Sequence, residues 1–387
     1  MKLAYVTTYD ASRLNGSNEW SGTGYYIAQA LKKQSIALDY LSPLTEPFGL
    51  SSIRKAKRLY YKLVERKNYQ SDADITLLKS YAQQVSKKLN NSQTQLDIVF
   101  SATVNQIAYL ECSQPIVFWA DATFANIKDF YPLYSNLSES VIRDWHQMDN
   151  LAIQKSKLAI YSSDWAAQSA IRDYGADPSK VMVIPFGSNV ESPFTNETIK
   201  SAIAARPSDR CKLLFLGVDW LRKGGNVAYE VAEKLNQSGL KTELTIIGCA
   251  PIVDSPLPNF VKSLGFISKA TQAGQAQISQ LLIESHFLIL PTLADCTPIV
   301  FCEANSVGVP CLSTTVGGVP TMIRNGINGQ LFAPEGNVAD CCDYITNLFA
   351  NYEDYKKLAL SAFNEYESRL NWTVAGRQVK DLLETLL

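Results

Sequence analysis

The sequence predicts an α/β protein built from two Rossmann-like domains, each with a doubly wound parallel sheet. Short apolar runs of strand type alternate with helical patterns, as in a parallel sheet covered by helices. The 387 residues are long for one hydrophobic core and suit two domains of ordinary size. A polar, proline-containing stretch at 187–209 separates two such series. We expect strands at 3–7, 37–41, 97–101, 116–120, 158–161 and 181–185, then at 213–217, 244–247, 286–290 and 309–313.

The composition argues against several classes of protein. Lys and Arg number 36 against 37 acidic residues, so a net charge of −1 gives no general attraction to nucleic acid. Eight cysteines without a Cys-x-x-Cys pair, and two histidines, indicate reduced thiols and no bound metal. No signal-peptide pattern opens the sequence, and no apolar run approaches the ~20 residues that span a bilayer. We expect a cytoplasmic protein.

The most informative stretch is 288–318, where an apolar strand leads through a loop into a helix. Thr297 has the chemistry of a helix N-cap, and Pro298 suits the first helical position, whose missing N–H costs nothing. The backbone N–H groups of Ile299 and Val300, with the positive end of the helix dipole, then favour an anion. Ligands of such sheets bind beyond the carboxyl ends of the strands, so this strand exit is a candidate site.

Two carboxylates flank this helix start. Glu303 lies about one turn beyond Val300 in an apolar segment, and it is not a capping-box glutamate, because the third helical position is Val300. On pattern alone, Glu303 is either a residue at a solvated edge of the helix or a carboxylate that accepts hydrogen bonds from a diol such as ribose. Asp295, eight positions earlier on the loop, would do the same for a second sugar.

This arrangement resembles the acidic pair of the retaining family 4 glycosyltransferases, written Glu-Gly-Phe-Gly-Leu-x-x-x-Glu and continued as Ala-x-x-x-Gly-x-Pro. Glu303 matches the second glutamate, 304–310 match the continuation, and the glycines at 317–318 match the next element. Asp295 stands where the first glutamate is usual, and 296–298 replace the Gly-Phe-Gly turn.

A second strand exit carries two cations. The strand that ends at Gly217 is followed by Arg222, Lys223 and Gly224, which resembles the family's Gly-Arg-Leu-x-x-x-Lys-Gly segment that grips the donor diphosphate. Lys223 matches the lysine, Val218 occupies the arginine position, and Arg222 would supply the guanidinium instead. The alternative is an ordinary exposed Arg-Lys pair.

The first strand exit leads through 15–24 into a helix. Gly22 and Gly24 do not complete a dinucleotide fingerprint, because Ile27 occupies the third glycine position. The segment matches the position of the family's N-terminal glycine-rich loop, which implies that its backbone approaches the substrate or the donor phosphate.

Asp121 follows the strand at 116–120, at a point where family members usually place a histidine that assists catalysis. Asp121 would accept a hydrogen bond from the donor sugar or from the acceptor, or it caps the turn at Ala122. His146 falls in a helix pattern and His286 at a strand start, so we expect both to be structural.

Residues 53–67 carry seven basic side chains and one acid, and their apolar residues Ile53, Ala56, Tyr60, Leu63 and Val64 recur at roughly helical spacing. Either the apolar side of this helix packs in the core, or the segment binds a membrane surface or an anionic acceptor. The Asp72-Ala-Asp74 sequence precedes an evident helix, so we expect capping rather than metal binding.

The resemblance implies a B-type glycosyltransferase (GT-B) fold, with two domains facing a cleft. The acceptor domain would be 1–188, completed by a crossover helix at 372–387, and the donor domain 189–371. It implies transfer of a hexose, with UDP-glucose as the first expectation, to a hydroxyl of a sugar or lipid-linked acceptor with retention of configuration. No cofactor or metal is implied, and the protein would be cytoplasmic, with peripheral membrane contact through 53–67. The alternatives are a nucleotide-sugar epimerase or phosphorylase on the same fold, and a nucleotide-sugar-binding protein without catalysis.

Overall fold

The computed structural model describes residues 1–14, 19–190, 194–253, 256–334 and 338–387, and in it the chain forms two compact units. Unit 1 contains Met1–Ile184 and Ala375–Leu387, and unit 2 contains Pro185–Val374. The sequence places the domain boundaries at 188 and 371. Parts of the predicted 15–24 loop and of the 187–209 linker, residues 15–18 and 191–193, lie outside the described residues.

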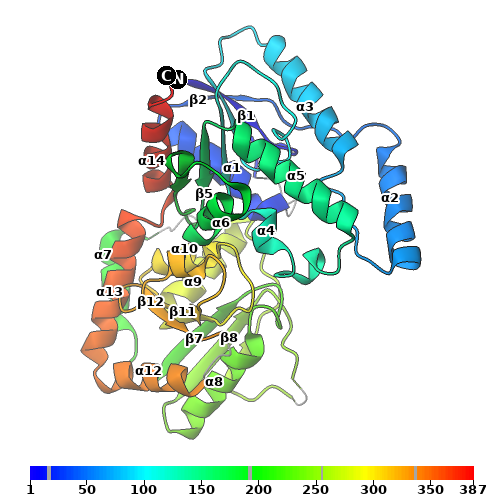
Figure 1. The fold of residues 1–387 in the computed structure, drawn as a ribbon. Helices are drawn as coiled ribbons and strands as arrows, with labels where there is room; N and C mark the ends of the chain where they lie inside the picture. Colours follow the sequence, from blue (N-terminus) through cyan, green and yellow to red (C-terminus); the bar gives the residue numbers. More distant parts are fainter. Residues whose placement is uncertain (15–18, 191–193, 254–255, 335–337) are drawn as a thin grey trace. The chain divides into compact units, whose positions relative to one another are not determined.

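Unit 1 is built on a six-stranded parallel sheet in the order β2-β1-β3-β4-β5-β6. The strands are β1 (Lys2–Val6), β2 (Ala37–Tyr40), β3 (Ile98–Ser101), β4 (Ile116–Ala120), β5 (Leu158–Tyr161) and β6 (Val181–Val183). The predicted strands are confirmed to within two residues at each end. The side chains of β3, β4 and β5 are all buried, because helices cover both faces of the sheet (Figure 1).

Seven α-helices of the described chain belong wholly or mainly to unit 1: α1 (Thr23–Lys33), α2 (Leu50–Tyr60), α3 (Ile75–Asn90), α4 (Phe124–Ile127), α5 (Glu139–Lys155), α6 (Asp164–Tyr174) and α14 (Trp372–Glu384). Short helical turns are η1 (Glu19–Gly22), η2 (Tyr61–Glu65), η3 (Pro132–Tyr134) and η4 (Pro178–Lys180). The predicted capping role of Asp74 is confirmed, since its carboxylate accepts from the N–H groups of Thr76 and Leu77.

Unit 2 has a second six-stranded parallel sheet, in the order β12-β11-β10-β7-β8-β9. The strands are β7 (Cys211–Leu216), β8 (Thr242–Ile247), β9 (Val261–Ser263), β10 (Phe287–Leu290), β11 (Cys311–Thr314) and β12 (Gly329–Phe332). The sequence predicted the four inner strands and missed β9 and β12. These two are short edge strands with one buried residue each, so they carry no run of apolar residues.

The helices of unit 2 are α7 (Asn196–Ala205), α8 (Gly225–Gln237), α9 (Gln272–Glu284), α10 (Ile299–Asn305), α11 (Val319–Met322), α12 (Val338–Ala350) and α13 (Tyr352–Ser368). Its core centres on β7 and β10, where Leu214, Phe215, Phe287 and Leu290 are each fully buried. Burial of such a side chain stabilises the fold by about 2 kcal/mol. All eight cysteines are free thiols, as predicted.

The basic stretch 53–67 forms the end of α2 and η2. Tyr61 packs partly against the core of unit 1, but the other large apolar side chains of the stretch do not. Leu50 is the one buried residue of α2. The large exposed side chains are Ile53 (54%), Leu59 (57%), Tyr60 (52%), Leu63 (66%) and Val64 (65%). The core-facing alternative for this stretch is therefore wrong. Within the described residues, no helix has the length and apolarity needed to cross a bilayer.

Candidate functional site

The candidate site lies where the strand order of unit 2 changes direction. The chain runs from β7 outward to β8 and β9, then returns to the other side of β7 as β10. At this switch point the loops after β7 and β10 leave the sheet from neighbouring parallel strands, with Leu214 in register with Leu288. Such a point is where an open α/β sheet forms its ligand crevice.

The two loops are joined through their backbones. The N–H of Leu293 donates to the carbonyl oxygen of Arg222 at 2.7 Å, and Nη1 of Arg222 donates to the carbonyl oxygen of Ala294 at 2.8 Å. Gly224 has a φ of 75° and lies so close that an added Cβ would come within 2.0 Å of the oxygen of Pro291. A residue without a side chain is needed at this point.

Lys223 and Asp295 meet at this junction in an ion pair between Nζ and Oδ2. Their side chains are 14% and 11% exposed. Arg222 is held beside them by Asp219, with 3.4 Å between Nε and Oδ2. The ideal Cβ position of Gly217 is 3.1 Å from Cγ of Lys223. The structure thus brings together the predicted residues Gly217, Arg222, Lys223 and Asp295.

The start of α10 differs from the prediction. The helix begins at Ile299, and Pro298 takes the cap position with an extended ψ of 102° and no side-chain hydrogen bond. Thr297 is therefore not the N-cap, because Pro298 does not adopt helical dihedral angles. The first backbone hydrogen bond runs from Phe301 to Pro298 at 3.1 Å, which leaves the N–H groups of Ile299 and Val300 ahead of it at the helix mouth.

Glu303 is buried, and its carboxylate is paired with Lys269. Nζ of Lys269 lies 2.7 and 2.6 Å from the two carboxylate oxygens. The Glu303 side chain has no exposed surface, whereas that of Lys269 is 35% exposed. The solvated-edge alternative for Glu303 is therefore wrong, and its partner is a lysine from the segment between β9 and α9.

The remaining predicted residues lie in unit 1. Gly22 is the N-cap of α1 with a φ of 78°, and an added Cβ on Gly24 would come within 2.2 Å of the Tyr9 hydroxyl. Asp121 follows β4, and its Oδ2 accepts from the indole N–H of Trp20 at 3.2 Å. The cap of α4 is Thr123 rather than Asp121.

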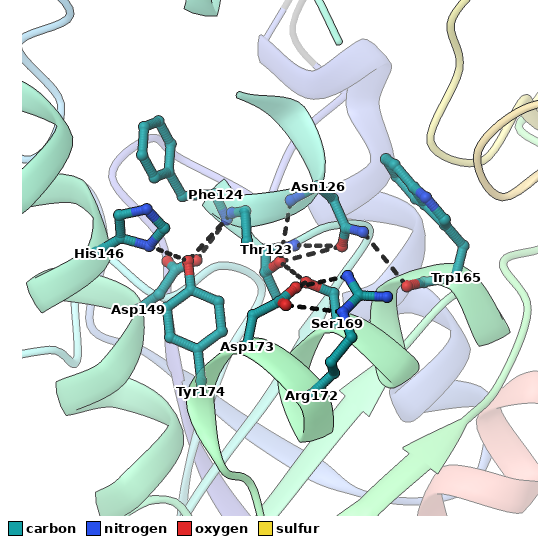
Figure 2. A network of polar contacts seen from close by, with 11 residues as sticks. Thr123, Phe124, Asn126, His146, Asp149, Trp165, Ser169, Arg172, Asp173 and Tyr174 are labelled. Carbon is teal, nitrogen blue, oxygen red and sulfur yellow. Dashed lines mark hydrogen bonds and ion pairs between the residues drawn. The ribbon is translucent and has the colours of Figure 1, made fainter. Parts of the chain in front are cut away.

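His146 and His286 are structural, as predicted. Nδ1 of His286 accepts from the N–H of Lys212 at 2.9 Å and Nε2 faces the oxygen of Pro207 at 2.9 Å; burial lowers the pKa of His286 to about 3. His146 contacts the Tyr174 hydroxyl at 3.0 Å, in a polar network that includes Asp149 (Figure 2).

Sequence reasoning missed Lys269 and Asp219. Lys269 follows a strand that the apolar pattern did not reveal, and a single lysine in a polar loop has no signal of its own. Asp219 could have been found, because it lies three residues before Arg222 in the same strand-exit loop. Within the described ranges, no group of three or more His, Cys, Asp or Glu side chains is placed to hold a metal ion.

Two parallel six-stranded sheets with flanking helices define the GT-B fold. The structure resembles sucrose-phosphate synthase from Thermosynechococcus elongatus, with a TM-score of 0.67 at 13% identity over 100% of this chain and 98% of that one. It resembles HepE from Anabaena, in a complex with UDP and glucose, with a TM-score of 0.64 at 15% identity over 100% of both chains.

Residues 196–364 match the model of the family described as glycosyl transferases group 1. It is 31% identical to the amylovoran biosynthesis glycosyltransferase AmsK of Erwinia amylovora over 43% of this chain and 42% of AmsK. It is 27% identical to a D-inositol 3-phosphate glycosyltransferase of Streptomyces bingchenggensis over 58% of this chain and 51% of that protein. The match spans about half the length of these relatives. The predicted resemblance to glycosyltransferases is confirmed at the level of group 1.

Proposed function

We propose that the protein is a retaining family 4 glycosyltransferase that moves a hexose from a nucleotide diphosphate sugar, UDP-glucose in the first instance, to a hydroxyl of a sugar or lipid-linked acceptor. The observation that carries the proposal is the ion pair between Lys223 and Asp295 at the switch point of the sheet of unit 2. A cation and a carboxylate side by side match the two ends of a sugar diphosphate, one anionic and one rich in hydroxyls.

In this proposal, Arg222 and Lys223 hold the diphosphate and the N–H groups of Ile299 and Val300 face the β-phosphate. A nucleoside diphosphate leaves with growing negative charge, and fixed cations and N–H groups stabilise that charge as it develops. Loss of one such contact typically raises the barrier by about 3 kcal/mol. These groups would supply the neutralisation that a divalent ion supplies elsewhere, so we propose transfer without a metal ion.

Glu303 would accept the ribose hydroxyls, and the ion pair with Lys269 would orient this buried carboxylate. Asp295, together with Thr297 and the Pro298 turn, would contact the sugar, and Asp121 would lie near the reaction centre. With no assigned nucleophile, retention favours attack of the acceptor on the face from which the diphosphate departs, and the departing phosphate takes the acceptor proton. This last step comes from the family resemblance.

The names of the relatives suggest two acceptor classes, a growing polysaccharide for AmsK and an inositol phosphate for the Streptomyces protein. We propose a sugar hydroxyl, in polysaccharide or glycoconjugate synthesis.

A lipid-linked acceptor would be reached at a membrane surface, and we propose that 53–67 makes this contact. Its exposed apolar side chains are accompanied by Lys55, Arg58, Lys62, Arg66 and Lys67, which complement anionic headgroups. Co-sedimentation with vesicles containing phosphatidylglycerol tests this. Leu63→Ser with Val64→Ser should reduce binding, whereas Ile252→Ser, also at an exposed apolar position (63%), should not. If the variant with Leu63→Ser and Val64→Ser binds these vesicles as strongly as Ile252→Ser does, the proposal is contradicted.

Calorimetric titration with UDP, and product analysis with UDP-glucose, test the main proposal. Lys223→Ala should weaken UDP binding at least tenfold, because a charge-assisted contact contributes about 1.5–3 kcal/mol. Lys234→Ala removes a half-exposed lysine of α8 and should leave UDP binding unchanged. If Lys223→Ala and Glu303→Ala both bind and turn over like wild type, the site is misassigned. Consumption of donor without acceptor indicates an epimerase, consumption only with inorganic phosphate a phosphorylase, and binding without any product an inactive binding protein.

A further inference from the structure

Unit 1 contains a cavity of about 330 Å³ that none of the predicted site residues lines. It lies beyond β1 and β3, whose ends are in register at Val6 and Ser101. Thr8 and Tyr9 line it from the exit of β1, and Asn105 and Gln106 from the exit of β3. Trp20 of η1 and Tyr81 of α3 complete the aromatic part of the wall. The volume is within the range of small-molecule sites.

The position of the cavity follows from the topology of the sheet. β1 lies between β2 and β3, so the chain adds β2 on one side of β1 and then crosses over to add β3 on the other. The exits of β1 and β3 therefore form the switch point of this sheet, as the exits of β7 and β10 do in unit 2. Each sheet thus has a switch point, and in unit 1 this cavity lies at it.

The polar wall of the cavity presents amide donors. The Thr103 hydroxyl lies 2.7 Å from Oε1 of Gln106 and 2.6 Å from Oδ1 of Asn105, and the Ser101 hydroxyl lies 3.2 Å from the same Gln106 oxygen. The Thr103 hydroxyl carries one proton, so it donates to one of these two amide oxygens at a time. Among the described residues, no acceptor is hydrogen-bonded to either NH2 group, so both are left to donate to a ligand.

The charge of the cavity is balanced. Arg54 is the one cation among the described lining residues, and its guanidinium is paired with Glu46 at 3.1 Å and with Asp72 at 3.5 Å. The same guanidinium also contacts the Ser71 hydroxyl. Nε of Arg54 has no hydrogen-bond partner among the described residues, but a phosphate or carboxylate bound to this guanidinium would approach the carboxylates of Glu46 and Asp72. The cavity therefore favours an uncharged ligand.

We propose that this cavity binds an uncharged pyranose of the acceptor, with the ring's C–H face against Trp20 and its hydroxyls at Asn105 and Gln106. The assignment of this sugar as the acceptor rests on the proposed glycosyltransferase function. Aromatic rings offer large rigid apolar surface, and amide donors match hydroxyl oxygens. The indole N–H of Trp20 donates to Asp121, so the stacking ring is fixed by the carboxylate that we place near the reaction centre. The phosphate of an inositol phosphate would not be accommodated.

Binding of methyl glycosides, measured by saturation-transfer NMR and calorimetry on the full chain, tests the assignment. The probes are both anomers of the methyl glycosides of glucose, galactose, mannose and N-acetylglucosamine, with glucose 6-phosphate and inositol 3-phosphate as charged counterparts. At least one uncharged glycoside should bind more tightly than the charged probes. Trp20→Ala and Asn105→Ala should each weaken that binding at least fivefold. Gln83→Ala, at an exposed position on the same α3 that carries Tyr81, should not.

The assignment is overturned if no uncharged glycoside binds, if a phosphorylated probe binds more tightly, or if Trp20→Ala binds like wild type. Circular dichroism of each variant verifies that its fold is intact. UDP binding, measured on the same samples, separates this proposal from the previous one. If wild type binds a glycoside in a Trp20-dependent way but does not bind UDP, the cavity assignment stands and the proposed glycosyltransferase function is wrong. If wild type binds UDP and Trp20→Ala leaves glycoside binding unchanged, the proposed function stands and the cavity assignment is wrong.

Discussion

The ammonium group of Lys223 and the carboxylate of Asp295 neutralise each other across two loops that are 72 residues apart in the chain. Both side chains are largely buried, so the pair is only weakly screened by solvent. In the proposed enzyme, a donor diphosphate must compete with Asp295 for Lys223. Asp295 is then released to contact the sugar, so donor binding and sugar positioning become coupled.

Asp295→Asn should separate these two roles. The amide no longer holds the ammonium group as an ion pair and no longer repels the diphosphate, so UDP, which has no sugar, should bind about fivefold more tightly, or about 1 kcal/mol. Turnover of UDP-glucose should fall at least tenfold, because the sugar loses a charged hydrogen-bond acceptor. Calorimetry and initial rates give the two quantities. Asp340→Asn, an exposed residue of α12, makes the same change of charge and should alter neither. Weaker UDP binding by Asp295→Asn would show that Asp295 does not compete for Lys223.

Gly224 should tolerate no side chain, because its backbone forms the contact between the two loops. Gly224→Ala places a methyl group against the oxygen of Pro291 at a φ of 75°, so we expect a loss of about 3 kcal/mol in stability and of measurable UDP binding. Gly239 offers a matched control, since its φ is 96° but nothing lies within 4 Å of an added Cβ. Gly239→Ala should cost about 1 kcal/mol, from the backbone strain alone, and leave UDP binding intact. Urea denaturation of the two variants measures the difference; equal losses would rule out the collision.

Lys269 should stabilise unit 2 through Glu303. Lys269→Met leaves a fully buried carboxylate without its partner. Because the lysine itself is 35% exposed, we expect a loss of about 2 kcal/mol, below the roughly 3–5 kcal/mol typical of fully buried pairs. Glu303→Gln combined with Lys269→Met should be more stable than Lys269→Met alone, because no charge is left buried. Lys262→Met, at an exposed position on β9, controls for the change of side chain. Urea midpoints in which the double variant is the least stable would contradict this account.

The candidate site of unit 2 could be located from the sequence because its residues follow buried, apolar strands. β7 and β10 are apolar runs, and in a parallel sheet the residues after such runs gather at one edge, so Lys223 and Asp295 could be placed before their contact was known. The position of Glu303 in an apolar segment indicated that it needs a partner, but the residue pattern did not indicate which one. Lys269 follows a three-residue edge strand, which has no periodicity to detect.

Other features depend on tertiary packing that residue patterns do not encode. The helical spacing of Ile53, Tyr60 and Leu63 correctly indicated an amphipathic helix, but spacing does not tell whether another element covers its apolar face. Thr297 and Pro298 have the composition of a helix start, yet the extended ψ of Pro298 moves the start of α10 to Ile299. The cavity at Asn105 and Gln106 lies in a polar loop, where neither residue type stands out.

Asp149 should make the stability of unit 1 fall as the pH rises. The carboxyl is buried, accepts from the N–H of Phe124 at 2.5 Å and lies beside the Tyr174 hydroxyl (Figure 2), and burial raises its pKa from 3.8 to about 7. Between pH 3.8 and 7 the folded protein therefore keeps a proton that the unfolded chain has lost. This contribution to stability is complete below pH 3.8 and is lost as the pH rises through 7, by about 1.4 kcal/mol per pH unit across the window.

Asp149→Asn removes the titrating proton, so the variant should lose this dependence of stability on pH. Urea denaturation of wild type and variant at several values from pH 4.5 to 8 measures it. The difference between the two free energies of unfolding isolates the contribution of Asp149 from those of all other groups. Asp173 is the matched control in the same network, because hydrogen bonds from Arg172 lower its pKa and place its own titration below this range. Asp173→Asn should therefore keep the wild-type slope between pH 4.5 and 7. If Asp149→Asn keeps the slope as well, the carboxyl is ionised throughout this range, and the hydrogen bonds from Phe124 and Tyr174 outweigh its burial.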